Sequence, residues 1–147
     1  RRRDGNESLK WGNVSLQAVA ERIFKVPIVL ENDAKLAALS EAMLLKDSYN
    51  RIVYITVSTG IGFALVVNGS LDTNTNDGSG QSMLLEHKGK LVAWEDFAGG
   101  KAIVERYGKR AEDIHDAATW KHICRDLTKG ILNILAMMQP EVIVIGG

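Results

Sequence analysis

Apolar residues recur every three or four positions in four stretches of the chain, and this spacing places them on one face of a helix. The predicted helices cover residues 16–24, 33–43, 94–107, with a break at Gly99-Gly100, and 117–138. Ser15 is expected to cap the first helix. The positions at helical spacing are Leu16, Val19, Ala20 and Ile23 in the first helix, Leu36, Ala37, Leu39, the small polar Ser40 and Met43 in the second, and Ile123, Leu127, Ile131, Ile134, Leu135 and Met138 in the last, where they form the expected buried stripe.

Runs of β-branched and apolar residues predict strands between these helices. Residues 51–57, RIVYITV, are largely apolar, which is typical of a strand buried on both faces. Residues 63–68 form the next predicted strand, and Asn68-Gly69 indicates a hairpin turn leading to Ser70-Leu71. Shorter strands are predicted at residues 28–30, 83–85, 91–93 and 142–145. Because the strands are interspersed with helices, we predict an α/β fold with a mixed sheet and flanking helices.

The composition is that of a globular domain with a modest core. The chain has 147 residues, and its 18 basic residues balance 18 acidic ones, so we expect no nucleic-acid binding through this segment. The apolar runs are far shorter than the roughly 20 residues of a membrane span, and no signal peptide is visible. We therefore expect a cytoplasmic protein without a membrane partner. The single cysteine, Cys124, excludes an internal disulfide and is expected to be a small buried residue.

Both ends of the chain are unusual. There is no initiator methionine, and the chain stops at Gly146-Gly147 directly after a predicted strand. We expect an internal piece of a longer protein, in which a site shared with other segments would be incomplete.

Glu31-Asn32-Asp33 is the first segment with candidate chemistry. It joins the predicted strand at residues 28–30 to a helix, and ligand sites in open α/β sheets lie at that edge. A carboxylate there can act as a general base toward a substrate hydroxyl. The alternative is that Asn32 or Asp33 only caps the helix, and the residues alone favour this alternative.

The turn at residues 57–62, VSTGIG, is the second candidate. Two glycines let backbone N–H groups approach phosphate oxygens closely, and the Ser58 and Thr59 hydroxyls add donors. The same residues are equally compatible with an ordinary tight β-turn that binds no phosphate. The third candidate is the strand end VIVIGG at residues 142–147, which alone indicates a sharp turn more often than a nucleotide site.

In this order, the three segments resemble the ROK family, which contains bacterial sugar kinases, glucokinase-like enzymes and sugar-responsive repressors. The matching motifs are ENDAKLAALSE at 31–41, STGIGFALVVNGSL at 58–71, WEDFAGGKAI at 94–103 and QPEVIVIGG at 139–147, and the segment LKWGNVSL at 9–16 is also similar. The resemblance implies part of an actin-like ATPase (ribonuclease H-like) fold with two lobes. Residues 1–45 would end the N-terminal lobe, and residues 46–147 would belong to a truncated C-terminal lobe.

The resemblance also implies roles for individual residues. Asp33 would be the catalytic base, and Asn32 and Glu95 would bind the sugar. Ser58, Thr59, Gly60 and Gly62 would hold the β- and γ-phosphates of ATP, and Gly146 and Gly147 would begin the adenosine-binding turn. Mg²⁺ is implied as a second cofactor, since phosphoryl transfer depends on positioning and charge neutralisation.

The chain departs from the family pattern after the hairpin. Family members usually carry Gly-Glu-x-Gly-His there, whereas this chain places Gln81 at the Glu position and Leu84 at the His position. His87 could substitute only by a shift in register, and a solvated hairpin histidine is the favoured alternative. No zinc is expected, because the cysteine-rich motif of many members is missing. Zinc-free relatives include polyphosphate-using glucokinases, so polyphosphate is a second possible donor.

No stretch matches the family's amino-terminal Asp-x-Gly-Gly-Thr phosphate loop. The hypothesis is therefore an ATP-dependent hexose kinase that is incomplete, and inactive as this fragment, with a homodimer expected for the full-length protein. A sugar-binding transcriptional regulator and an inactive kinase-like protein of the same family are the alternatives.

Overall fold

The computed structural model describes residues 14–73 and 78–147, and the chain divides into two compact units, residues 1–31 and 32–147. In the first unit, helix α1 (Leu16–Phe24) begins after Ser15, whose Oγ accepts a hydrogen bond from the Ala18 amide. The strand predicted at residues 28–30 does not form, and Val29 is 88% exposed. Three apolar residues form a strand only beside a hydrogen-bonding neighbour, and no strand pairs with them among the described residues.

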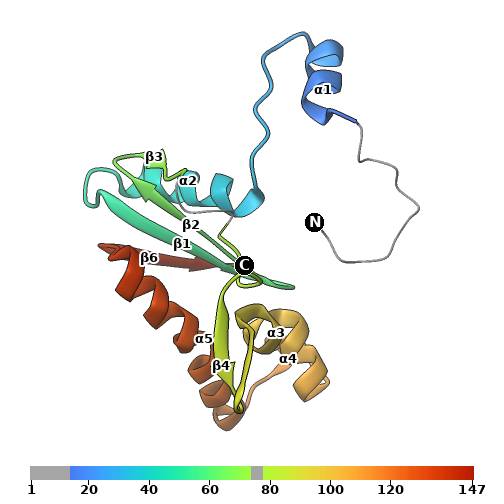
Figure 1. Cartoon of the computed structure of the whole chain (residues 1–147), viewed down its shortest axis with the longest axis vertical. Coiled ribbons are helices and arrows are strands. Elements are labelled where there is room, and N and C mark those ends of the chain that lie inside the picture. Colours follow the sequence, from blue (N-terminus) through green and yellow to red (C-terminus); the bar gives the residue numbers. More distant parts are fainter. Residues whose placement is uncertain (1–13, 74–77) are drawn as a thin grey trace. The chain divides into compact units, whose positions relative to one another are not determined.

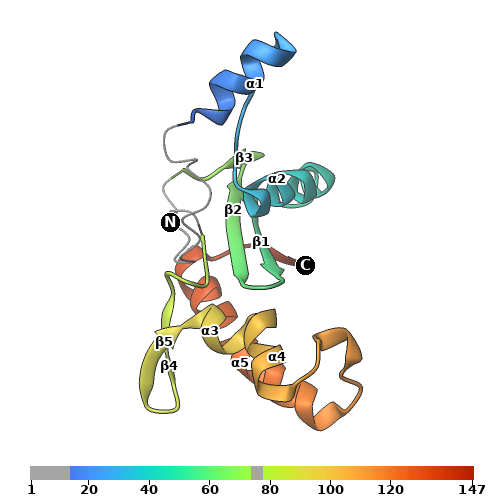
Figure 2. The same cartoon turned by 90° about the vertical axis from the view of Figure 1, so that its right-hand side faces the viewer.

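The second unit contains the mixed sheet that the sequence predicts (Figures 1 and 2). Its strands are β1 (Arg51–Val57), β2 (Ile61–Val67), β3 (Ser70–Leu71) and β6 (Val142–Gly146), in the order β3-β2-β1-β6. β1 pairs with β2 in antiparallel and with β6 in parallel orientation. Asn68 and Gly69 both have positive φ, which explains why this pair makes the β2–β3 turn.

Side chains alternate between the two faces of the sheet, because successive strand residues point in opposite directions. Helix α2 (Asp33–Leu45) covers one face, where its three buried alanines, Ala34, Ala38 and Ala42, face the strands. The larger apolar residues that the helical spacing singled out are instead exposed, Leu36 at 52% and Met43 at 64%. Alanine is small, so it lets the helix approach the sheet closely, which the pattern of large apolar residues does not reveal.

The opposite face carries the main core (Figure 1). It is covered by helix α3 (Trp94–Ala98), helix α5 (Ala117–Met138) and the two-stranded hairpin of β4 (Leu84–His87) and β5 (Lys90–Ala93). The buried residues of this cluster are Val53, Ile55, Ile61, Phe63, Leu65, Trp94, Phe97, Ala98 and Ile134. Burying each large side chain of this kind contributes about 1.5–3 kcal/mol, so this face stabilises most of the unit.

Helix α5 has the predicted bounds, but its buried stripe is narrower than predicted. Ile123 and Ile134 are buried, whereas Leu135 is 41% exposed. Cys124 is exposed, so the prediction of a buried cysteine is wrong. Each residue of a helix is rotated by about 100° from the last, and burial of Ile123 therefore turns its neighbour toward solvent.

The predicted helix at residues 94–107 is indeed broken at its glycine pair. Helix α3 ends at Gly99, and helix α4 (Gly100–Tyr107) begins at once in a new direction, followed by the 3₁₀ turn η2 (Ala111–Asp113). Ile103, Ile114 and Ile123 form a small cluster beneath α4. Within the part of the chain that the structure describes, no helix has the length and apolarity needed to cross a membrane.

The division into compact units falls between Glu31 and Asn32, so α2 belongs with the sheet. The lobe boundary predicted after residue 45 concerns the arrangement of the full-length protein, and it stays a prediction.

Candidate functional site

The turn between β1 and β2 presents polar groups at the carboxyl end of β1. Ser58 and Thr59 are exposed, and the Ser58 amide donates a hydrogen bond to the Gly60 carbonyl at 3.0 Å, which closes the turn. Among the residues that the structure describes, the amides of Thr59 and Gly60 donate no hydrogen bond. The turn therefore offers backbone N–H groups and two hydroxyls of the kind that bind anions.

The first turn of helix α4 rests against this segment. The Gly100 amide donates to the Ser58 carbonyl at 2.7 Å, and the Lys101 amide donates to the Thr59 carbonyl at 3.0 Å. A Cβ atom at position 100 would overlap the Ser58 carbonyl, so only glycine permits this approach. Two of the orphan amides that begin a helix are thus satisfied by the turn, and the two elements hold each other in place.

Glu95 reaches the same turn from helix α3. Its Oε2 accepts a hydrogen bond from the Ile61 amide at 3.3 Å and lies 2.6 Å from where a Cβ of residue 60 would be. The segment before the hairpin is tied in as well, because the Gly80 amide donates to the Ile61 carbonyl at 2.7 Å and the Gly80 carbonyl accepts from the Glu95 amide at 3.4 Å. A carboxylate therefore lies beside the polar turn.

Asn32 and Asp33 lie at the start of α2, where the sheet packs against this helix. Asn32 is the cap, and its Oδ1 accepts hydrogen bonds from the amides of Ala34 and Lys35 at 2.9 and 3.3 Å. Asp33 occupies the first helical position and is exposed, and its Oδ1 also accepts from the Ala34 amide at 2.9 Å. The helix is therefore capped by Asn32 and not by Asp33, and the exposed Asp33 carboxylate is accessible to a ligand. Ala34 is near the turn, since its Cβ is 3.2 Å from where a Cβ of Gly62 would be.

Gln81 and His87 are the residues that could replace the family's Glu and His, and they lie apart in the structure. Gln81 is exposed and follows Gly80, so it lies near Glu95. His87 pairs with Lys90 at the far end of the hairpin, whereas Leu84 pairs with Ala93 next to Glu95. The alternative interpretation of His87 as a solvated hairpin residue is wrong. Its side chain is 15% exposed and stacks on Phe97, with ring centroids 4.4 Å apart.

Gly146 and Gly147 complete the edge of the sheet on the other side of β1. Gly146 lies opposite Thr56 in the parallel register, and Gly147 has a φ of 134°. A side chain on Gly147 would overlap the carbonyl of Val57. The chain can therefore pass very close to β1 only because these positions carry no Cβ.

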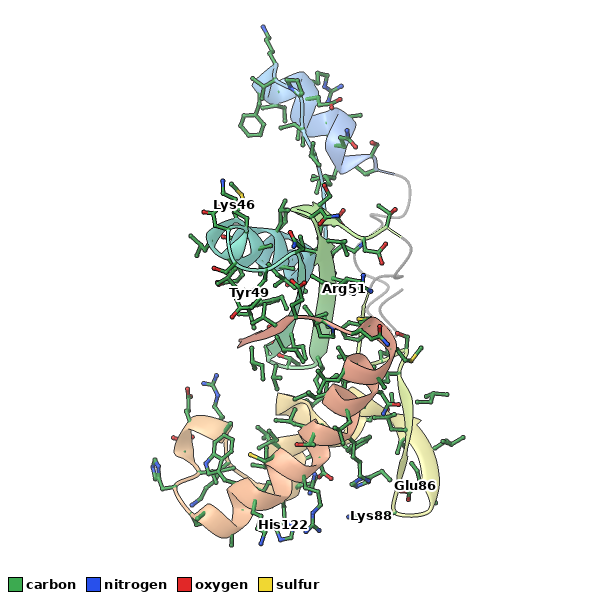
Figure 3. The ribbon with its side chains drawn as sticks, turned by 90° about the vertical axis from the view of Figure 1, so that its left-hand side faces the viewer. Lys46, Tyr49, Arg51, Glu86, Lys88 and His122 are labelled. Atoms are coloured by element: carbon green, nitrogen blue, oxygen red, sulfur yellow. The ribbon has the colours of Figure 1, made fainter. Side chains whose placement is uncertain are left out.

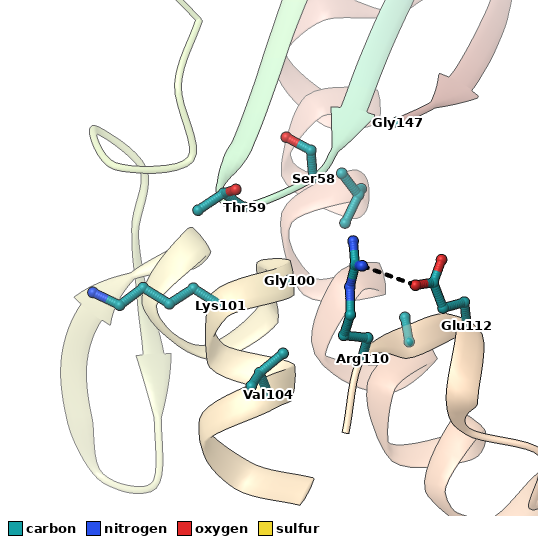
Figure 4. A pocket seen from close by; sticks show the side chains of 10 residues that line it. Ser58, Thr59, Gly100, Lys101, Val104, Arg110, Glu112 and Gly147 are labelled. Atoms are coloured by element: carbon teal, nitrogen blue, oxygen red, sulfur yellow. Dashed lines mark ion pairs between the residues drawn. The ribbon is translucent and has the colours of Figure 1, made fainter. Parts of the chain in front are cut away.

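A cavity of about 530 Å³ opens between this edge and helix α4 (Figure 4). It is lined by Val57, Ser58, Thr59, Gly100, Lys101, Val104, Arg110, Ala111, Glu112 and Gly147. Arg110 and Glu112 form an ion pair at 3.1 Å, and both side chains are largely exposed. Cavities of about 300–1,000 Å³ hold small organic ligands, so this one is large enough for a nucleotide.

Sequence reasoning missed the wall that α4 and η2 contribute to the cavity. Gly100, Lys101 and Val104 come from α4, and Arg110 and Glu112 follow it. The glycine pair inside WEDFAGGKAI was a usable signal, because two consecutive glycines between helices indicate close backbone contact. Nothing in the pattern of residues 104–112 indicated a ligand.

The fold is α/β, and a candidate ligand site lies at the carboxyl ends of β1 and β6 in its mixed sheet. The family profile described as the ROK family matches residues 5–147. The chain belongs to the ROK family, and its fold is part of the actin-like ATPase fold, as the sequence motifs predicted.

The relatives include both enzymes and regulators. The xylose repressor of Bacillus spizizenii is 26% identical, covering 92% of this chain and 41% of the repressor. A putative fructokinase of Bacillus subtilis is 26% identical, covering 93% of this chain and 50% of that protein. A ROK family protein from Streptococcus pneumoniae, solved in complex with sucrose, has a TM-score of 0.72 at 27% identity, covering 88% of this chain and 51% of that one.

The chain spans about half the length of the curated relatives it matches. Members of the family thus include sugar kinases as well as sugar-named repressors.

Proposed function

We propose that the chain is part of a sugar kinase that transfers the γ-phosphate of ATP to a hexose hydroxyl. The observation that carries the proposal is the convergence on one turn. The amides of Thr59 and Gly60, the Glu95 carboxylate and the start of α2 meet there, and the cavity adjoins it. Phosphoryl transfer requires mainly such positioning of donor and acceptor.

Asp33 would act as the general base in this site. Its carboxylate is accessible at the first position of α2, where it can accept a proton from a sugar hydroxyl. Glu95 and Gln81 would hydrogen-bond other hydroxyls of the same sugar, and Asn32 would contribute from the cap of α2. His87 lies at the far end of its hairpin, so we do not include it among the sugar-binding residues.

The nucleotide would occupy the cavity between β1, β6 and α4. Thr59 and the amides of the turn would bind the phosphates, while Val104, Ala111 and Gly147 would face the adenosine. Among residues 14–73 and 78–147, no group of three or more His, Cys, Asp or Glu could hold a metal. Mg²⁺ uses one or two protein oxygens together with substrate phosphates, and in this proposal the Thr59 hydroxyl would supply one of them. Bound there, Mg²⁺ would neutralise phosphate charge.

The test is sugar-dependent ADP release by the full-length protein and its Asp33→Asn variant, with D-glucose and D-fructose. Loss of the base should lower kcat roughly 10²–10⁴-fold, while sugar binding measured by calorimetry changes little. Asp47→Asn, in the exposed turn after α2, is the matched control and should retain wild-type kcat. Equal rates for wild type and Asp33→Asn would refute the role of Asp33.

A sugar-responsive transcriptional regulator is the second candidate. The similarity to a xylose repressor over 92% of this chain favours it, and the Gln81 and Leu84 departures are compatible with binding without turnover. Under this alternative, the full-length protein binds a sugar but releases no ADP, and its affinity for operator DNA changes when sugar is added.

A further inference from the structure

Asp126 is a buried acid on α5 that the proposed chemistry does not use. It is 6% exposed, and its Oδ2 pairs with Arg106 Nη1 at 2.6 Å. The same Arg106 nitrogen donates to the Phe97 carbonyl at 2.8 Å, near the end of α3. One guanidinium therefore connects three helices, because Arg106 lies on α4, Phe97 on α3 and Asp126 on α5.

The backbone of Asp126 also holds the residue before Glu95. Trp94 Nε1 donates to the Asp126 carbonyl at 3.2 Å, and the indole is completely buried. One turn further along α5, Gly130 provides the space for it, since a Cβ there would overlap the indole. Trp94 is thus fixed by one hydrogen bond and by contact with the α5 backbone.

The hairpin packs on the same group from its turn end. His87 Nδ1 lies 3.7 Å from Asp126 Oδ1, and its ring stacks on Phe97 with an angle of 14° between the planes. Lys129 Nζ, also on α5, donates to the Glu86 carbonyl at 2.9 Å. Figure 3 shows Glu86 and Lys88 at the turn of this hairpin. Arg106 of α4 and His87 of the hairpin therefore lie against the Asp126 carboxylate, and Trp94 of α3 is bonded to the backbone carbonyl of the same residue.

Stability alone gives little reason for this arrangement. Replacing a buried ion pair by apolar residues of similar size is often neutral or stabilising, so the pair is weak evidence of a purely stabilising role. What the pair adds is geometry. Through Arg106 it holds α3 at the Phe97 carbonyl, while the backbone carbonyl of Asp126 holds α3 at Trp94. Glu95 projects from that helix to the Ile61 amide.

We propose that Asp126 is a positioning residue that, through Arg106 and Trp94, holds α3 so that the Glu95 carboxylate reaches the turn at residues 58–62. The placement of Glu95 stands on the geometry alone. Only its importance for a sugar and phosphate site rests on the proposed function.

Amide hydrogen exchange of Ile61 in the full-length protein is the direct measurement. Asp126→Asn removes the charge that holds Arg106, and a hydrogen bond to a charged group is worth about 1.5–3 kcal/mol. We expect the Ile61 amide to exchange at least about tenfold faster in this variant, whereas the Leu65 amide in the same strand keeps its wild-type rate. Asp113→Asn, on the exposed turn η2, is the matched control and should change neither rate.

A second mutation distinguishes positioning from general loosening. In a Glu95→Ala background, Asp126→Asn should accelerate Ile61 exchange no further, because the acceptor is already gone. Should Asp126→Asn fail to fold, Arg106→Lys, which keeps a positive charge but loses the guanidinium that bonds both Asp126 and the Phe97 carbonyl, is judged by the same criterion. Unchanged Ile61 exchange in the folded variant, or equal acceleration with and without Glu95, would overturn the proposal. A protein without kinase activity that still shows the Ile61 effect would refute the proposed function and leave the positioning role intact.

Discussion

At the scale of single residues, glycines permit several close contacts because they have no side chain. Gly100 lets α4 lie against the Ser58 carbonyl, and Gly130 lets the Trp94 indole lie against α5. Gly130 has no conformational reason to be glycine, because it lies in the interior of a regular helix. Its role is to provide space, and this makes it a sharp test of the packing.

Gly130→Ala should destabilise the sheet unit by about 1–3 kcal/mol, because the added methyl overlaps a completely buried ring. At an exposed helical position the same change would stabilise by about 0.5–1 kcal/mol, so the expected sign is reversed. Urea unfolding monitored by circular dichroism measures the difference, and Thr128→Ala on the exposed face of α5 is the control. A Gly130→Ala protein as stable as wild type would contradict the close contact with Trp94.

At the scale of elements, His87 is one of the contacts between the β4–β5 hairpin and the helices, because its ring stacks on Phe97. Burial lowers the pKa of His87 below its ordinary value of 6.5, and the Asp126 carboxylate opposes this only in part. Lys129 on α5, Arg106 on α4 and Lys88 in the hairpin turn lower the pKa further. The histidine is therefore neutral in the folded protein at neutral pH.

The sign of the pH dependence follows from this shift. A proton binds more tightly to His87 in the unfolded chain than in the folded one, so the stability that His87 contributes is present above about pH 6.5 and is lost as the pH falls through the folded pKa. The free energy of unfolding should decrease between about pH 7.5 and pH 5 in wild type. His87→Phe, which preserves stacking on Phe97, should decrease less steeply.

His122→Gln is the control for this experiment, because His122 is an exposed residue of α5. It should keep the wild-type slope. An identical slope in wild type and His87→Phe would show that the hairpin is not attached through a neutral His87.

At the scale of the whole molecule, the core belongs to one of the two compact units. Every buried apolar residue in the described part of the chain comes from Ala34 or later, and α1 contains no buried residue. The cap of α2 is Asn32, the first residue of the larger unit. The sheet with its helices therefore has the components of an independent folding unit.

A shortened chain of residues 32–147 should keep the cooperative unfolding of the sheet, with a Tm within about 4–8 °C of the 1–147 chain, the change that about 1 kcal/mol causes in a domain of this size. Thermal unfolding followed by circular dichroism measures it. Removing residues 32 and 33 as well deletes the α2 cap and should lower the Tm further. Loss of cooperative unfolding in residues 32–147 would contradict the division.

The sequence by itself determined the mixed α/β fold, the bounds of β1 and α5, the break at Gly99-Gly100 and the family. The fold and the element bounds depend on local patterns, such as the β-branched run of β1 or the glycines that interrupt helices. The family assignment depends on four short sequence motifs and their order along the chain. The strand predicted at residues 28–30 was wrong because strand formation depends on a partner, which a run of three apolar residues does not specify.

Only the tertiary structure decided which side chains meet. It placed Glu95 against the Ile61 amide and His87 at the turn end of its hairpin, gave α2 an alanine contact face and formed the cavity with residues 100–112. Residues far apart in sequence form these contacts, and their distances depend on how helices pack across the sheet. A linear pattern records which side chains a segment can bury, but the packing of other segments determines which of them it does bury.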